Sequence, residues 1–334
     1  MKRIRVSFAG LEVEFVDRER ALEQVREFGE RGTFPVYVVY GPEGCGKTAF
    51  LKQAKTILEE EYGYHVIYTN PLAKRIEEIF QYSPTAKELV EKAFSIFSDP
   101  LARAVDLVIN VAGWIMQKFR RARVAVLMDD IFQAVGVENA EAYVKALLNL
   151  IEWPPAEYDR VVVLVASSEG ITRKRVGRHN WADIFVMWNM SRDGFRQLYE
   201  QLPGPKPPFD EAWRLTGGNP RYLGELHQRG WSVEAVVDGV VTRRGVRQLA
   251  ARWGEALAKV VEDPDYLWDK YPETEALIND LVEANLIIEV WDRKPHLWID
   301  QPPPEKDAEL GIGRYFAWQT PLHREAVRKA LEAT

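Results

Sequence analysis

The chain has 334 residues and a formal net charge of −6, and this length exceeds what one hydrophobic core usually supports, so two or three domains are expected. Its 46% hydrophobic and 28% charged content is typical of a soluble globular protein, and no uncharged apolar stretch approaches the roughly 18 residues of a membrane span. The single cysteine excludes an intramolecular disulfide framework and a cysteine-rich zinc site, and it fits a reducing cytoplasm.

Short apolar strands alternate with helices in the first part of the chain. Strands are predicted at residues 36–40, 65–69, 124–128, 161–166 and 184–187. Helices are predicted at residues 48–61, over a long region 73–121 with a break at 98–100, and at 138–151. This alternation is typical of a parallel sheet covered by helices on both faces. We therefore expect an α/β domain over residues 1–190.

The octapeptide between the first strand and its helix is Gly41-Pro42-Glu43-Gly44-Cys45-Gly46-Lys47-Thr48, which fits the phosphate-binding P-loop pattern G-x-x-x-x-G-K-[ST]. The strand before it and the helix after it argue against a glycine-rich turn with an incidental lysine. The glycines let backbone N–H groups turn inward as an anion nest, and the helix N-terminus adds partial positive charge. Lys47 would reach the β- and γ-phosphates, the Thr48 hydroxyl would hold Mg²⁺, and Ala49 would continue the nucleotide-binding segment. We therefore expect this chain to bind a nucleoside triphosphate.

Two adjacent carboxylates, Asp129 and Asp130, follow the apolar strand at 124–128. A carboxylate in this position holds the Mg²⁺ that bridges the β- and γ-phosphates in P-loop enzymes, which predicts Asp129 as a metal ligand. Asp130 could orient or deprotonate the attacking water. The alternative is that both residues simply cap the next helix.

Polar and basic residues follow the next strand. Ser167 and Ser168 could hydrogen-bond the γ-phosphate or the attacking water, although serine also serves as a turn or cap residue at strand ends. One basic residue of the loop that follows could stabilise charge at the γ-phosphate, with Arg173 as the first candidate, or the loop could simply be solvated. The basic residues of this loop are Arg173, Lys174, Arg175 and Arg178.

The pattern changes from about residue 191, where helices without strands are predicted over 191–262, with the segment Thr216-Gly217-Gly218-Asn219-Pro220 between two of them. Residues 263–334 combine a helix at 273–284, strands near 286–291 and 297–299, an extended segment at 315–319 and a helix at 323–332. We expect a helical domain at 191–262 and a small winged-helix-like domain at 263–334.

These motifs resemble those of AAA+ ATPases, and within them the STAND group of signal-transduction ATPases that includes the NB-ARC switches. The resemblance is strongest to the largely archaeal ATPase family of that group. It covers roughly residues 12–334, and it is carried by the P-loop and three further segments: 15–19 (FVDRE), 127–130 (LMDD) and 216–223 (TGGNPRYL).

The resemblance implies a P-loop sheet of the AAA+ (ASCE) type, a helical lid over the nucleotide, and ATP or ADP as the ligand with Mg²⁺. Residues 15–19, with Val16 and Arg18, would cover the adenine and ribose. Pro220 would lie near the base, and Arg221 stands where related ATPases carry an arginine that reaches the phosphates. His323 is a candidate for contact with a bound diphosphate.

The sequence departs from many AAA+ enzymes at Asp130, where they carry glutamate. The shorter side chain suggests slow hydrolysis, which suits a switch whose states are set by the bound nucleotide. On this hypothesis Lys47, Asp130, Ser168 and Arg173 carry catalysis.

Three functions stay open at this point: a nucleotide-gated switch acting on an unknown protein partner or by self-association, a DNA-associated loader or remodeller, and a non-catalytic nucleotide-binding scaffold. Residues 245–334 hold 11 Lys and Arg against 17 Asp and Glu, whereas the rest of the chain is balanced. A nucleic-acid surface is normally basic, so DNA is a possible but less favoured partner. No membrane partner is expected.

Overall fold

The computed structural model describes residues 2–73, 79–96, 104–168, 170 and 172–333. The chain forms two compact units. The first contains Met1–Ile4, Glu19–Tyr40 and Lys47–Val186, and the second contains Arg5–Arg18, Gly41–Gly46 and Met187–Thr334. The P-loop is therefore divided, because its first six residues cluster with the second unit and Lys47 begins the first unit's next segment.

The first unit contains a mostly parallel sheet, as the alternating pattern predicts. Its strands run in the spatial order β8-β3-β7-β6-β4-β5, and only β5 is antiparallel to its neighbour. The strands are β3 (Val36–Tyr40), β4 (His65–Thr69), β5 (Phe80–Tyr82), β6 (Ala122–Asp129), β7 (Tyr158–Ser167) and β8 (Ala182–Met187). Their side chains are almost all buried, which is why these segments read as continuous apolar runs.

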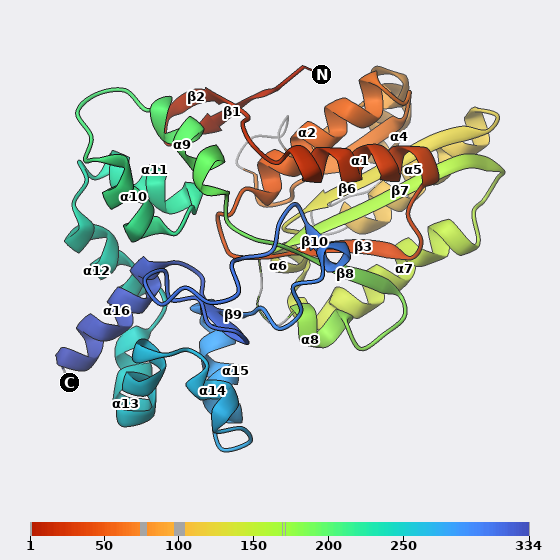
Figure 1. Ribbon diagram of the computed structural model, residues 1–334. Coiled ribbons are helices and arrows are strands. Elements are labelled where there is room, and N and C mark those ends of the chain that lie inside the picture. The colour runs from red at the N-terminus through yellow and green to blue at the C-terminus, as the bar shows by residue number, and fades with distance from the viewer. Residues whose placement is uncertain (1, 74–78, 97–103, 169, 171, 334) are drawn as a thin grey trace. The chain divides into compact units, whose positions relative to one another are not determined.

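Helices cover both faces of this sheet (Figure 1). One face packs against α1 and α2, and the other packs against α4, α5 and α7. The helices and short 3₁₀ turns of the unit are α1 (Glu19–Arg31), α2 (Lys47–Glu60), η1 (Pro84–Ala86), α4 (Lys87–Ile96), α5 (Ala104–Lys118), α6 (Ile131–Val135), η2 (Val137–Asn139), α7 (Ala140–Glu152) and α8 (Thr172–Val176).

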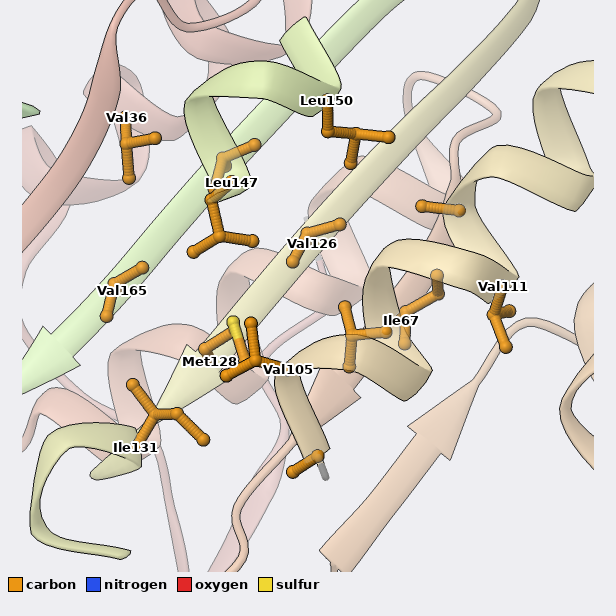
Figure 2. Packing of buried hydrophobic residues seen from close by; sticks show 14 of the residues in the cluster. Val36, Ile67, Val105, Val111, Val126, Met128, Ile131, Leu147, Leu150 and Val165 are labelled. Atoms are coloured by element: carbon orange, nitrogen blue, oxygen red, sulfur yellow. The ribbon is translucent and has the colours of Figure 1, made fainter. Parts of the chain in front are cut away.

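The core of the first unit lies between the sheet and the helices α5 and α7. Figure 2 shows Leu147 and Leu150 of α7 and Val105 of α5 near the strand residues Val126 and Val165. These side chains are at most 4% exposed, so the cluster excludes water and fixes the strands whose carboxyl ends carry the candidate site.

One predicted segment of the first unit is wrong in part. We predicted helix over 73–121, but residues 80–82 form β5, which pairs antiparallel with β4 from Phe80 opposite Thr69 to Tyr82 opposite Ile67. Phe80 is buried and packs edge-on against Phe94, so a tertiary contact outweighs the local helical pattern. The predicted break at 98–100 lies outside the described residues.

The N-terminal part of the second unit is a hairpin that the sequence analysis missed. Strands β1 (Arg5–Phe8) and β2 (Leu11–Glu14) pair antiparallel. Their apolar side chains pack on a cluster that includes Phe195 and Leu223, from α9 (Arg192–Glu200) and α11 (Pro220–Gln228). The hairpin thus belongs to the same core as these helices.

The remaining helices of the second unit share one core. Its buried members come from both sides of residue 262, for example Val240 and Leu257 before it and Leu277 and Trp318 after it. The further elements are α10 (Phe209–Thr216), α12 (Val233–Arg243), α13 (Val246–Glu262), α14 (Tyr266–Asp269), α15 (Glu275–Glu283), β9 (Ile287–Glu289), η3 (Pro295–Leu297), β10 (Trp298–Ile299), β11 (Phe316–Trp318) and α16 (Pro321–Glu332).

The strands β9 and β11 near the C-terminus form a two-stranded sheet. β9 pairs antiparallel with β11, from Ile287 opposite Trp318 to Glu289 opposite Phe316, across a long connection. The boundary at 262 and the winged-helix assignment of 263–334 stay predictions. In the part of the chain that the structure describes, no helix combines the length and apolar character needed to cross a membrane.

Candidate phosphate and metal site

The sheet order brings the candidate residues of the first unit to one edge. β7 lies between β3 and β6, and because these strands are parallel their carboxyl ends meet at the same edge. Tyr40, the last residue of β3, is opposite Ser167 in β7, and Ala166 is opposite Asp129 in β6. The P-loop therefore follows β3, while Ser167 is the last residue of β7 and Asp129 is the last residue of β6.

The P-loop leads directly into α2, which begins at Lys47. Lys47 is 4% exposed, and Thr48 and Ala49 are half-buried in the first turn. Gly44 and Gly46 have φ values of 78° and 106°, in the left-handed region that glycine adopts without strain. The first-turn N–H groups of this helix and its dipole are the usual source of phosphate affinity in such a loop.

The residues before Lys47 are held tightly within the second unit. A Cβ on Gly41 would lie 2.0 Å from the carbonyl oxygen of Met187, so no larger residue fits there. The Cys45 N–H donates to the carbonyl of Pro42 over 3.2 Å, and its buried thiol lies 3.5 Å from the Met187 carbonyl oxygen. The loop is thus constrained at Gly41 and at Cys45 by contacts with Met187 and by its own internal hydrogen bond.

Asp129 is buried at the end of β6, with 1% of its surface exposed. Its Oδ2 accepts hydrogen bonds from the Tyr68 hydroxyl and from Asn70 Nδ2, each over 3.1 Å, while its Oδ1 has no hydrogen-bond partner among the described residues. Burial raises the pKa of the Asp129 carboxyl, against the opposing effects of the Thr48 and Tyr68 hydroxyls and the Lys47 charge. The two hydrogen bonds fix the orientation of the carboxylate and leave one oxygen available.

The residues around Asp129 fit a Mg²⁺ ion held jointly with phosphate. A buried carboxylate oxygen without a protein partner and a nearby threonine hydroxyl are hard oxygen ligands, and Mg²⁺ in nucleotide sites uses one or two such protein ligands plus phosphate oxygens and water. In the described ranges no cluster of three or more His, Cys, Asp or Glu side chains could hold a metal by itself. Thr48 and Asp129 are therefore the residues that would hold the ion.

Asp130 directly follows and has a left-handed backbone, with φ 48°. It stands at the N-cap position of α6, yet its side chain makes no capping hydrogen bond to that helix. The helix-cap alternative therefore loses its main support for Asp130, which is half-buried beside the buried Asp129. A left-handed non-glycine residue at such a position is a form of strain often found at functional sites.

The serines after β7 differ in their surroundings. Ser167 is buried, and its Oγ lies 2.7 Å from the Thr172 hydroxyl, whereas Ser168 is half-buried and outside the strand. Arg173 is half-buried in α8. The Nε of Arg175 is buried without a hydrogen-bond partner among the described residues, and Arg178 forms an exposed ion pair with Glu141. Arg178 is thus bound to α7 through Glu141 at the surface.

The segment Gly217–Arg221 contacts the P-loop within the second unit. Asn219 caps α11, where its Oδ1 accepts from the Tyr222 N–H, and its Nδ2 donates to the carbonyl of Glu43 over 3.0 Å and to Asn189 Oδ1 over 2.8 Å. The Arg221 N–H donates to the Gly44 carbonyl over 3.3 Å. Pro220 is the first residue of α11 and is half-buried. This motif therefore fixes the P-loop backbone as well as starting a helix.

The side chain of Glu43 is bound by two arginines. Its Oε1 pairs with Arg221 over 2.5 Å, and its Oε2 pairs with Arg244, at the end of α12. Burial raises the pKa of the Glu43 carboxyl, but the charges of Arg244 and Arg221 outweigh it and the pKa lies below its usual value. Sequence reasoning missed Arg244, because nothing local relates it to a loop 201 residues away.

Arg18 occupies a structural position within the second unit. It is 2% exposed, it pairs with Asp300 over 2.9 Å, and it donates to the carbonyls of Cys45 and Trp188 over 2.8 Å each. Val16 packs against the apolar cluster around Phe195. The guanidinium of Arg18 thus joins the P-loop to two distant segments, a role that the sequence did not reveal.

His323 is fully buried near the start of α16. Its Nε2 lies 3.1 Å from the Tyr222 hydroxyl and its Nδ1 lies 2.9 Å from the Thr320 hydroxyl. Burial, together with the Arg244 charge, lowers the pKa of His323 to about 3. The ring is therefore neutral at physiological pH and brings no positive charge toward a diphosphate.

Comparison with known proteins places the chain in a family. Residues 15–226 match the model of an ATPase domain found predominantly in Archaea. An uncharacterized ATP-binding protein of Pyrococcus abyssi is 23% identical, over 95% of this chain and 98% of that protein. The solved Walker-type ATPase of Pyrococcus abyssi shares the fold with a TM-score of 0.53 at 15% identity, over 94% of this chain and 96% of that one. An Aeropyrum pernix ORC2 structure aligns with a TM-score of 0.44 at 14% identity, over 94% of this chain and 93% of that one. Residues 15–226 are more than half of this chain, so the chain belongs to the family of ATPase domains found predominantly in Archaea.

Proposed function

We propose that this protein binds ATP and ADP with Mg²⁺, hydrolyses ATP slowly, and acts as a nucleotide-gated switch. Membership of an ATPase-domain family supports ATP hydrolysis in general. The strand, loop and helix around Lys47 and the buried Asp129 support a phosphate and metal site of the P-loop kind. The switch, the slow rate and the metal dependence are the parts that go beyond the family.

The proposed roles follow the position of each side chain. Lys47 neutralises charge on the phosphates. Thr48 and Asp129 would hold Mg²⁺, which would supply further neutralisation of the phosphate charge. Asp130 orients the attacking water, with Ser168 and Arg173 as the candidate groups near the γ-phosphate. Residues 15–19, with Val16 and Arg18, remain the proposed cover of the adenine and ribose, and Pro220 the proposed neighbour of the base. Arg18 acts through the loop carbonyl that it binds.

One observation carries the switch: the P-loop backbone is hydrogen-bonded to the helix that begins at Pro220. Asn219 binds the Glu43 carbonyl and the Arg221 N–H binds the Gly44 carbonyl. A ligand that reshapes the P-loop must therefore break these bonds or move α11 with the loop. A shift of this helix changes the surface that the second unit offers to a protein partner or to a second copy of the chain.

The test combines nucleotide binding and turnover on the full chain. Fluorescent ATP and ADP analogues give affinities with Mg²⁺ and with EDTA, and phosphate release gives the rate. We expect wild-type turnover below about one per second, at the slow end of enzymes in general. Lys47→Ala should lose nucleotide affinity, whereas Lys55→Ala, on the same helix and paired with Glu59, should not. Asp130→Asn should keep affinity and lose turnover.

Several outcomes would contradict the proposal. Turnover above several per second without any partner would exclude a slow switch. Wild-type phosphate release by Asp130→Asn would mean that hydrolysis does not use the assigned site. Stimulation by duplex DNA with a steep salt dependence would instead support the DNA-associated alternative.

A further inference from the structure

We propose that Glu43 competes with the phosphates of bound nucleotide for Arg221 and Arg244, and that Arg244 is a second phosphate-binding arginine of the site. The inference rests on the proposed nucleotide binding and deepens it. It assigns a function to a P-loop side chain and to an arginine outside every motif of the sequence.

The Glu43 carboxylate uses each oxygen for a different arginine. Oε1 pairs with Arg221 in the first turn of α11, and Oε2 pairs with Arg244, the residue after α12. Two helices that are separate in the sequence thus converge on one P-loop side chain. Glu43 is the one acidic residue of the octapeptide, so its carboxylate is the P-loop group that pairs with both guanidinium groups.

The backbone of Glu43 is hydrogen-bonded on both sides, while its carboxylate is placed by the two ion pairs. Its N–H donates to Gln319 Oε1 over 2.9 Å, and its carbonyl accepts from Asn219 Nδ2 over 3.0 Å. The next residue, Gly44, has φ 78°, and a Cβ there would lie 2.2 Å from the Cβ of Arg221. Arg221 therefore lies directly against the P-loop and not merely near it.

The surrounding charges favour a polyanion. Glu225 pairs with Arg243 over 3.0 Å and lies farther from Arg221, at 3.4 Å, so Arg221 and Arg244 share the single carboxylate of Glu43. One positive charge remains in excess where the P-loop meets these helices. A nucleotide phosphate carries more negative charge than one carboxylate and suits the planar guanidinium fork, so it is the stronger acceptor for these arginines.

The ion pair between Glu43 and Arg244 is partly shielded from solvent, which strengthens it. The side chains of Glu43 and Arg244 are 23% and 20% exposed, against 48% for Arg221. Exposed ion pairs contribute little because of screening, whereas partly desolvated pairs have larger coupling. The exchange of partners at Arg244 should therefore alter nucleotide affinity measurably, and it would link the start of α11 to the end of α12 when nucleotide binds.

The test uses Glu43→Gln, which keeps the shape of the side chain and removes its charge, and Arg244→Gln. Arg243→Gln is the matched control, because Arg243 is the neighbouring residue and pairs with Glu225 instead of Glu43. Affinities for fluorescent ATP and ADP analogues are measured for each full-length protein with Mg²⁺. Thermal unfolding of each variant confirms that the fold is retained, and Arg244→Lys provides a second variant that keeps charge without the planar fork.

We expect Glu43→Gln to bind ATP about tenfold more tightly and Arg244→Gln about tenfold more weakly, with a smaller effect on ADP. Arg244→Lys should fall between wild type and Arg244→Gln, and Arg243→Gln should stay within about threefold of wild type. Arg244→Gln should reduce ATP affinity more when it is made in the Glu43→Gln protein than when it is made in wild type. In the Glu43→Gln protein Arg244 has no ion pair with residue 43 to break before it binds phosphate.

Two results would overturn the inference. One is unchanged or weaker ATP binding by Glu43→Gln. The other is equal effects of Arg244→Gln and Arg243→Gln. A wild-type protein that binds neither nucleotide would instead refute the proposed function, so the two failures are distinguishable.

Discussion

Removal of the Asp300 carboxylate should be among the most destabilising single changes in the second unit. Arg18 and Asp300 form an ion pair over 2.9 Å, with side chains 3% and 4% exposed. Asp300→Ala leaves the guanidinium of Arg18 buried without its counter-charge. Breaking a buried pair from one side costs about 3–5 kcal/mol. Arg18 keeps its hydrogen bonds to the Cys45 and Trp188 carbonyls, so we expect the lower end, about 3 kcal/mol.

The assay is urea unfolding followed by tryptophan fluorescence, which reports mainly on the second unit because most tryptophans of the chain lie there. The control is Asp210→Ala, which removes an exposed pair with Arg192 in the same unit and should cost less than about 1 kcal/mol. Asp300→Asn should be less destabilising than Asp300→Ala, because the amide oxygen can still accept a hydrogen bond from the guanidinium of Arg18. An Asp300→Ala protein that loses no more stability than Asp210→Ala would refute this reasoning.

Three further predictions concern single residues. The pKa of His323 lies at about 3 in the folded chain, below its ordinary 6.5, so between these values the unfolded chain binds a proton that the folded chain does not, and stability falls as pH falls. About 2 kcal/mol should be lost from pH 7 to pH 5, and His323→Gln should show a correspondingly flatter pH dependence in urea unfolding; an unchanged slope would contradict the burial argument. Asp129→Asn should abolish the effect of Mg²⁺ on ATP affinity while affinity in EDTA stays within about threefold, and an intact Mg²⁺ effect by the same titration would remove Asp129 from the metal site. Asn219→Ala should lower the free energy of unfolding by roughly 1–2 kcal/mol, because it removes the α11 cap and the hydrogen bond to the Glu43 carbonyl. A loss in urea unfolding below about 0.3 kcal/mol would contradict a stabilising role for these two hydrogen bonds.

Local patterns in the sequence predict much of the first unit. The apolar strand before the P-loop is β3 at its predicted bounds, and the strand at 65–69 is β4 at its predicted bounds. These segments are buried on both faces, so continuous apolar runs identify them without knowledge of their neighbours. The same reasoning finds Asp129 at the end of β6, because the buried strand and the first polar residue after it are adjacent in the sequence.

The features that sequence analysis missed depend on distant partners. Strands β1 and β2 do alternate polar and apolar side chains, but each has only four residues and is only partly buried, so the pattern is too short to stand out in the sequence. β5 is set by its pairing with β4 and the contact of Phe80 with Phe94, which no local pattern contains. Asp300 is 282 residues from Arg18, and Arg244 is 201 residues from Glu43. A charged residue in a helix or loop looks solvent-exposed in sequence until the fold supplies its partner.

The P-loop is held by side chains and backbone from three separate segments of the second unit. Arg18 binds the Cys45 carbonyl, Asn219 binds the Glu43 carbonyl, and Gln319, just after β11, accepts from the Glu43 N–H. Loop residues of a purely local anion nest would need only their own turn and the helix that follows. Here any change in the loop backbone must break hydrogen bonds to an N-terminal turn, to the start of α11 and to the connection before α16, or it must move them together. Asn189 donates to the Gln319 carbonyl and accepts from Asn219, and its own carbonyl accepts from Arg18 over 3.4 Å. The three contacts are therefore joined through Asn189 and would respond as a group.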